Sequence, residues 1–355
     1  MSFLPLVFDF AASLRSFMIN PLVNGLILGI MVLGVFISFR ILNIADLSVE
    51  GILPMITMVT AVFIDMDVNP ILVLLISMAL GAIVGILNAL LTVYLKIPPL
   101  LSGIIMMALT FGVAIMINSL KAGQVSFDAN SHLTVFNWLR NLLFQISDNN
   151  VFRFYASYLS YILVAALLMV IIGFALYFFF GTELGMSIRA AGKNKEMAEA
   201  NGISTNKMSI IALAISGALI GFASSLYGQH NGMGLPTDGQ GMIVIALSSL
   251  FLGEIVIGAR TFKRSLLSAI IGSLLYWYVI QVLMLLDTQG YMLSVYKALL
   301  LIAIIVLQFG ISVFKKSHPK GGEGVKRSKK EALKEKGEEV AMNIKRLCLG
   351  GNYVC

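Results

Sequence analysis

The chain has few charged residues and almost no cysteine. Only 12% of its 355 residues are Asp, Glu, Lys or Arg, whereas soluble domains carry about 25%. The two cysteines, Cys348 and Cys355, lie close to the C-terminal end, and their spacing fits no zinc-binding pattern. We therefore expect neither a disulfide framework nor a cysteine-based metal site in the body of the chain.

Motifs for catalysis and nucleotide binding are also missing from the sequence. There is no Gly-x-x-x-x-Gly-Lys-Ser/Thr phosphate loop, and the glycine-rich run that begins at Gly321 has the wrong spacing for one. The three histidines are far apart in the sequence, so they suggest no metal-ligand group. We expect a non-catalytic chain with no metal site and no cofactor of its own.

Apolar residues fill most of the chain instead. They make up 58% of it, with a mean hydropathy of +0.91, against about 45–50% in soluble domains. The net charge of +7 is concentrated in residues 315–355, which hold 11 Lys/Arg and 5 Asp/Glu. Basic residues beside membrane spans mostly mark the cytoplasmic side. We therefore expect an integral membrane protein whose tail contacts membrane lipid, with no nucleic-acid partner.

Runs of about 20 apolar residues are needed to cross a bilayer. On this criterion the sequence predicts an all-α polytopic protein with about nine transmembrane helices. The predicted spans are 17–39, 47–64, 71–95, 99–119, 157–180, 208–229, 241–258, 265–286 and 291–314. Residues 1–16 lack a basic start and contain an early acidic residue, so we expect no cleavable signal peptide there.

Lysines and arginines between the spans predict the orientation. The side that carries residues 182–207 and the tail holds most of them, so it is predicted to be cytoplasmic, with the N-terminus outside and the C-terminus inside. The predicted divisions are an extracytoplasmic amphipathic segment 1–16, a membrane domain 17–314 with an extracytoplasmic segment 120–156 and a cytoplasmic segment 182–207, and a basic cytoplasmic tail 315–355.

Two polar, helix-breaking stretches predict an internal repeat. Residues 43–51 read Asn-Ile-Ala-Asp-Leu-Ser-Val-Glu-Gly, and residues 232–240, 189 positions later, read Gly-Met-Gly-Leu-Pro-Thr-Asp-Gly-Gln. The same offset relates the turns near 65–70 and 254–259. Five spans separate the copies, so spans 1–4 and 6–9 would run in opposite directions, as in the inverted-topology repeats of transporters.

The polar segment 182–207 resembles the coupling loop of permease subunits of bacterial ABC importers of the branched-chain amino acid and ribose type. The resemblance rests on Gly185, Arg189–Gly192, Asn194, Ala198 and Gly202-Ile203. Residues 43–51, 85–100 and 239–253 resemble further motifs of that family, so the likeness covers about 17–314. Within it, the chain is most similar to permeases paired with binding proteins of the aromatic amino acid type. Gly253-Glu254 departs from the family's frequent Gly-Gly.

The resemblance implies a set of partners and a location. It implies a second copy of the permease, a pair of cytoplasmic ATPase subunits that bind ATP and Mg²⁺, an extracytoplasmic substrate-binding protein, and the bacterial cytoplasmic membrane. The residues expected to couple to the ATPase are Glu183, Gly185, Arg189, Ala190, Gly192, Asn194 and Gly202. The alternative for this segment is a solvated helix whose charges merely avoid the membrane.

Polar residues at the two breaks are the candidates for a substrate path, because interrupted backbone at a span entrance offers free amides and carbonyls to a ligand. These candidates are Asn43, Asp46, Ser48, Glu50, Thr237 and Gln240. Alternatively, Asp46 and Glu50 lie hydrated at the cytoplasmic interface and favour the start of the second span. Glu254 is followed by Arg260, Lys263 and Arg264, so an interfacial ion pair competes with a substrate contact.

Three functions were weighed on these residues. An ABC importer permease for a small polar solute, with amino acids, aromatic ones included, as the first candidates and sugars or nucleosides as alternatives, accounts for segment 182–207. An ion-coupled secondary transporter that uses Asp46, Glu50 and Glu254 does not need that segment. A membrane enzyme lacks any cluster of His, Asp and Glu at membrane depth.

Overall fold

The structure, a computed structural model, describes residues 3–121, 125–127, 132–144, 150–258, 261–286 and 293–317. Contacts divide the chain into Met1–Ile305 and Val306–Cys355, and the fold described below is that of the first unit. Both cysteines and most of the predicted tail lie outside the described residues.

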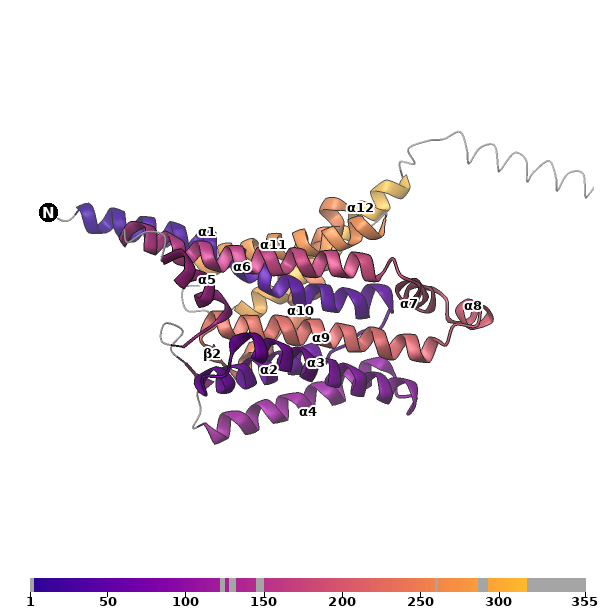
Figure 1. Cartoon of the computed structure of the whole chain (residues 1–355). Helices are drawn as coiled ribbons and strands as arrows, with labels where there is room; N and C mark the ends of the chain where they lie inside the picture. Colours follow the sequence, from indigo (N-terminus) through magenta and orange to yellow (C-terminus); the bar gives the residue numbers. More distant parts are fainter. Residues whose placement is uncertain are drawn as a thin grey trace, which may run out of the picture. The chain divides into compact units, whose positions relative to one another are not determined.

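The elements (Figure 1) are α1 (Phe3–Val35), the π-helical η1 (Phe36–Ile41), α2 (Val49–Asp65), α3 (Pro70–Val93), α4 (Pro99–Leu120), β1 (Val125–Ser126), α5 (Val135–Phe144), α6 (Asn150–Phe179), α7 (Glu183–Lys193), α8 (Lys195–Ala200), α9 (Thr205–Asn231), β2 (Met233–Gly234), the 3-10 turn η2 (Pro236–Gly239), α10 (Met242–Ile257), α11 (Phe262–Leu286) and α12 (Leu293–Ser317).

Among the described residues, seven helical segments are long and apolar enough to cross a membrane, as in a polytopic membrane protein. They are Met18–Ile41, Pro70–Val93, Pro99–Leu120, Leu159–Phe179, Thr205–Asn231, Pro236–Ile257 and Phe262–Met284. The other two predicted spans correspond to α2 and α12. Helix α2 has 17 residues, and the apolar part described in α12 is Val295–Gln308.

The described residues are mostly helical, as predicted, and they include one small β-structure. Val125 of β1 and Gly234 of β2 are partners in an antiparallel pair of two-residue strands. The sequence analysis did not predict this pair, because two residues are too few to show an alternating pattern.

Prolines and side-chain caps set several helix boundaries. Asn69 accepts a hydrogen bond from the Ile71 amide at 3.0 Å and caps α3, whose first residue is Pro70. Proline suits this first position because its missing amide hydrogen has no helical partner there. Pro99 begins α4 in the same way. The turn predicted near residues 65–70 is therefore confirmed.

Helices α1 and α9 form the centre of the bundle. In the most apolar window of each, 83% and 61% of the residues are buried, against 28–39% in the other five spans. Helix α9 packs on α1, α2 and α3, and α1 also packs on α11. The outer helices α3, α4 and α6 expose rows of Leu, Ile and Phe, as expected for surfaces that face lipid tails.

Small residues bring the central helices α1 and α9 close to their neighbours. A Cβ atom on Gly81 or Gly85 of α3 would overlap backbone atoms of Gly217 or Leu213 of α9. On α1, a Cβ on Gly25 would lie 3.1 Å from the Cα of Leu274 in α11. Since lipid tails are as apolar as the helices, such close van der Waals packing supplies much of the attraction between membrane helices.

The two ends of the bundle carry different elements. Figure 1 shows α7 and α8 at the end where α6 finishes and α9 begins, with α5 and β2 at the opposite end. Segment 182–207 is therefore separated by the length of the bundle from the β1–β2 pair.

Candidate functional site

Segment 182–207, hereafter the coupling segment, folds into the two short helices α7 and α8. Thr182 caps α7 by accepting from the Gly185 amide at 3.3 Å, and Asn194 caps α8 by accepting from the Met197 amide at 3.1 Å. Polar caps satisfy amides that have no partner within a helix. The Thr and Asn of this polar sequence therefore specify two helices with a sharp bend at Asn194.

Helix α7 lies directly on the end of η1. A Cβ on Gly192 would overlap the carbonyl oxygen of Ile41, so only glycine permits this approach. The Asn43 side-chain amide donates to the Gly192 carbonyl at 3.0 Å. At the start of α7, a Cβ on Gly185 would overlap backbone atoms of Phe179 and Phe180. Gly185 and Gly192 thus face inward, and Asn43, predicted in the substrate path, lies at the coupling segment.

The opposite face of the coupling segment is exposed and both apolar and charged. Leu184, Met186 and Met197 are each more than half exposed. Glu183, Arg189, Ala190, Asn194, Lys195, Glu196 and Gly202 are exposed around them. Exposed Met and Leu among charges are suited to a protein contact, because the apolar groups gain by burial and the charges fix the register.

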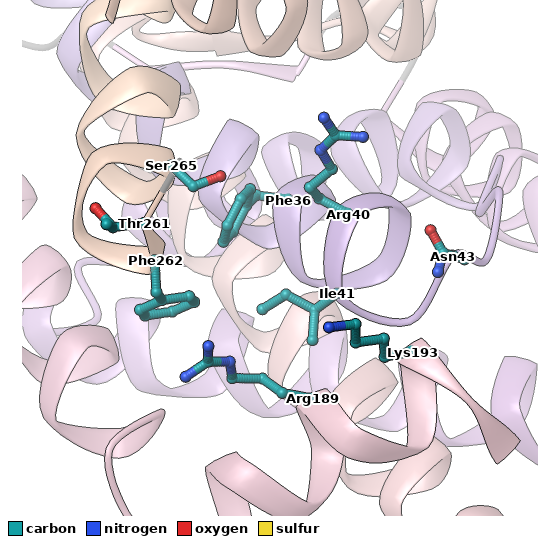
Figure 2. Close-up of a pocket in the computed structure, with 9 residues that line it drawn as sticks. All are labelled: Phe36, Arg40, Ile41, Asn43, Arg189, Lys193, Thr261, Phe262 and Ser265. Atoms are coloured by element: carbon teal, nitrogen blue, oxygen red, sulfur yellow. The ribbon is translucent and has the colours of Figure 1, made fainter. Parts of the chain in front are cut away.

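Basic side chains line a cavity of about 370 Å³ beside α7. Figure 2 shows Arg189 and Lys193 of α7 on one side of Ile41, with Arg40 on the other. The guanidinium carbon of Arg189 lies 4.7 Å from the ring centre of Phe262, the first residue of α11, in a cation–π contact. The cavity therefore lies between α7, η1 and α11, and basic and aromatic side chains from these elements line it.

Glu254 forms an ion pair with Arg40, which is 214 positions away in the sequence. The Arg40 Nε lies 2.7 Å from Glu254 Oε1, and Nη2 donates to Oε2 at 2.8 Å. The Glu254 side chain is 8% exposed and that of Arg40 43%. Two parallel bonds fix orientation better than one, so the pair holds the end of α10 against η1, on which α7 rests.

We expect Gly192→Ala to loosen α7, because the added methyl group meets a backbone carbonyl and backbone cannot move aside as a flexible side chain can. Overpacking of this kind costs about 1–3 kcal/mol. Thermal unfolding in detergent measures the cost. Gly112→Ala is the matched control, because a Cβ there has open space. Equal melting temperatures for the two variants would contradict the packing role of Gly192.

The two polar breaks meet in the structure. A Cβ on Gly239 of η2 would overlap the carbonyl oxygen of Glu50 in the first turn of α2. The Glu50 carboxylate faces the backbone amides of Gly241 and Ile243, where α10 begins, and it also faces Lys297 of α12. We call this region, residues 46–51 with 236–243, the junction.

The structure brings some predicted path residues together and separates others. Thr237 and Gln240 are exposed beside Glu50 at the junction, whereas Ser48 is fully buried. Asp46 is also buried: its Oδ1 accepts from the Ser48 amide at 2.9 Å and from Asn88 Nδ2 of α3 at 2.8 Å. This carboxylate therefore holds the first break against α3, inside the protein and away from the hydrated interface considered above.

The sequence analysis did not predict the contacts that several residues make at these sites. Arg40 is 214 positions from Glu254, and no role was predicted for Lys297. Asn88 was quoted within a motif, but its bond to Asp46 was not foreseen. The available signal was a polar or charged residue inside an apolar helix, which is costly in a membrane unless it has a partner or a function.

The chain resembles known transport proteins over most of its length. Residues 17–307 match the family model described as branched-chain amino acid transport system / permease component. The tyrosine transport system permease protein of Clostridioides difficile (strain R20291) is 27% identical over 287 residues, 81% of this chain and 90% of that protein. The ribose import permease protein RbsC of Escherichia coli (strain K12) is 25% identical over 74% of this chain and 76% of its own length.

A third relative, the D-allose transport system permease protein AlsC of Escherichia coli (strain K12), is 28% identical over 79% of each chain. No solved structure matches the chain. The family match spans α1 to α12 and includes both the coupling segment and the junction. The chain therefore belongs to the family of permease components of branched-chain amino acid transport systems.

Proposed function

We propose that the chain is the non-catalytic membrane subunit of an ATP-driven importer, and that the coupling segment is the docking surface for a separate ATPase. The observation that carries this proposal is the packing of α7. Its inner glycines lie on η1 and α6, while its outer face offers exposed Leu, Met and charged groups. A force on α7 from a partner passes directly into the end of α1.

The second part of the proposal is a substrate path at the junction. Thr237 and Gln240 are exposed there, and Glu50 and Lys297 are half-buried. Polar groups on the outer surface of membrane helices are costly against lipid, so water or a partner must cover them. A second copy of this chain facing the junction would enclose such a path, and we propose a homodimer for this reason.

An inverted repeat is supported by the helix boundaries. When shifted by 189 positions, the first and last residues of α2 and α3 fall within four residues of those of α10 and α11. The packing has the same correspondence: α1 packs on α11 as α9 packs on α3. We propose that spans 1–4 and 6–9 are the two copies and that α2 and α12 complete a set of nine membrane helices.

The orientation follows from the charges of the coupling segment. We propose that it faces the cytoplasm, with the N-terminus outside and the C-terminus inside. Two ATPase subunits holding ATP and Mg²⁺ would then meet α7 and α8. A substrate-binding protein would dock at the opposite end, near α5 and the β1–β2 pair.

The ion-coupled alternative is less well supported by the positions of the carboxylates. Asp46 is bonded to Asn88, Glu50 faces the start of α10, and Glu254 is paired with Arg40. Each of the three carboxylates therefore has different partners, an arrangement that does not favour one shared ion site. Among the described residues, no group of three His, Cys, Asp or Glu is placed to hold a metal ion.

Uptake by the reconstituted complex tests the function. The relatives named above transport tyrosine, ribose or allose by their names, and we propose an amino acid as the substrate. The permease, its ATPase and its binding protein in liposomes should accumulate a radiolabelled amino acid when ATP is supplied, and still do so when ionophores remove all ion gradients. Uptake that requires an ion gradient and not ATP would contradict the proposal.

A further inference from the structure

A pair of opposite charges lies at the junction. The carboxylate of Glu50 in α2 and the ammonium group of Lys297 in α12 attract each other electrostatically. The stem of Lys297 packs at Gly241, 3.8 Å from where a Cβ would stand. Two helices that are distant in the sequence thus place one carboxylate and one ammonium group at the start of α10.

The pair lies deep within the helix bundle. Glu50 precedes the end of α2 at Asp65 by 15 residues, which is about 22 Å of helix. The hydrocarbon core of a bilayer is about 30 Å thick, and Asp65 lies at the end of the bundle, where it is paired with exposed Lys121. Charges at such depth mark substrate or ion pathways more often than they serve packing alone.

The first turn of α10 adds a second group that favours an anion. The amides of Gly241 and Ile243 begin this helix and face the Glu50 carboxylate. A helix N-terminus carries partial positive charge, so a carboxylate is stabilised there. Together with Lys297, whose side chain lies against Gly241, these amides form a region that favours a carboxylate, and the Glu50 carboxylate faces it.

We propose that Glu50, Lys297 and the first turn of α10 bind the two charged groups of a zwitterionic amino acid as it passes through the path; this inference rests on the proposed transport function. The substrate carboxylate takes the place of Glu50 at the α10 amides and Lys297. The released Glu50 carboxylate then pairs with the substrate ammonium group. The site is neutral before and after this exchange, so no net charge is moved into the low-dielectric interior.

An uncharged sugar gains nothing from such an exchange. It would have to bind while Glu50 and Lys297 still attract each other, or separate these two charges without supplying charges of its own. Separating two half-buried opposite charges without replacement is unfavourable. The charges at the junction therefore favour amino acids over sugars.

The test compares Glu50→Gln, Lys297→Met and the double variant in the complete reconstituted complex, with L-tyrosine and D-ribose as probes. Each single variant should lower the rate of ATP-driven L-tyrosine uptake by about 10- to 100-fold. The double variant should transport as poorly as the single ones, because the substrate ammonium group has no partner and the substrate carboxylate keeps only the α10 amides. Lys121→Met and Asp65→Asn are the matched controls, since that pair is exposed at the end of the bundle.

Two outcomes overturn the inference while leaving the transport function in place. If the double variant regains the wild-type uptake rate, the two charges of Glu50 and Lys297 only neutralise each other and do not bind substrate. If the wild-type complex takes up D-ribose and no amino acid, the site does not select a zwitterion. Substrate uptake by the wild-type complex that does not depend on ATP would instead contradict the proposed function, and the inference would fail with it.

Discussion

Arg189→Glu is expected to remove most ATP-driven uptake while leaving the membrane helices folded. Arg189 is exposed on α7, and its guanidinium covers the ring of Phe262. Loss of an exposed cation–π contact costs only about 0.5–1 kcal/mol, so the melting temperature should change little. Reversed charge in a docking surface costs several kcal/mol through like-charge contacts, so we expect the ATPase to bind about 100-fold more weakly.

Co-purification of the ATPase with the permease measures this effect, and the melting temperature in detergent monitors the fold. Arg189→Lys is the matched control, because it keeps the charge and a cation above Phe262. Wild-type co-purification and transport by Arg189→Glu would show that the ATPase does not contact this part of the coupling segment.

The two substitutions that remove the Arg40–Glu254 ion pair are expected to lower the free energy of unfolding by different amounts. In Arg40→Met, the nearly buried Glu254 carboxylate loses its bidentate partner, and unfolding should become easier by about 3 kcal/mol, the lower end of the range for buried pairs. In Glu254→Gln, the half-exposed Arg40 is hydrated and can still donate to the amide oxygen. The cost there should be about 1 kcal/mol.

A double-mutant cycle measures the interaction itself. The loss of stability in Arg40→Met/Glu254→Gln should be smaller than the sum of the single losses, because the two side chains contact each other. The single variants should also reduce transport for each ATP hydrolysed, since the pair joins η1, beneath α7, to α10. If the stability losses of the single variants add up in the double variant, and transport for each ATP hydrolysed is unchanged, the ion pair has no role in coupling.

Hydropathy alone predicted most of the membrane helices, because a span must be continuously apolar and about 20 residues long. The positions of the two polar breaks also predicted real features, since each break has a local cause. Local rules fail where two distant residues meet. Nothing near Arg40 in the sequence indicates Glu254, and nothing near Glu50 indicates Lys297, because packing of whole helices brings these side chains together.

The candidate site was predicted in outline but not in the role of each residue. Asn43 and Gly192 were assigned to different sites, yet the Asn43 amide bonds the Gly192 carbonyl. The sequence showed that residues 182–207 were polar and able to form helices. It did not show that Gly185 and Gly192 face inward, because the direction of a glycine depends on the element packed against it.

Site-directed cross-linking tests most directly whether the coupling segment receives the ATPase. In a background with Cys348→Ser and Cys355→Ser, a single cysteine replaces Met197 of α8 or Trp138 of α5, both well exposed and at opposite ends of the bundle. A short bifunctional reagent is applied to the assembled complex. The account predicts a covalent product between the ATPase and position 197 and none at position 138. A product at position 138 and none at position 197 would contradict it.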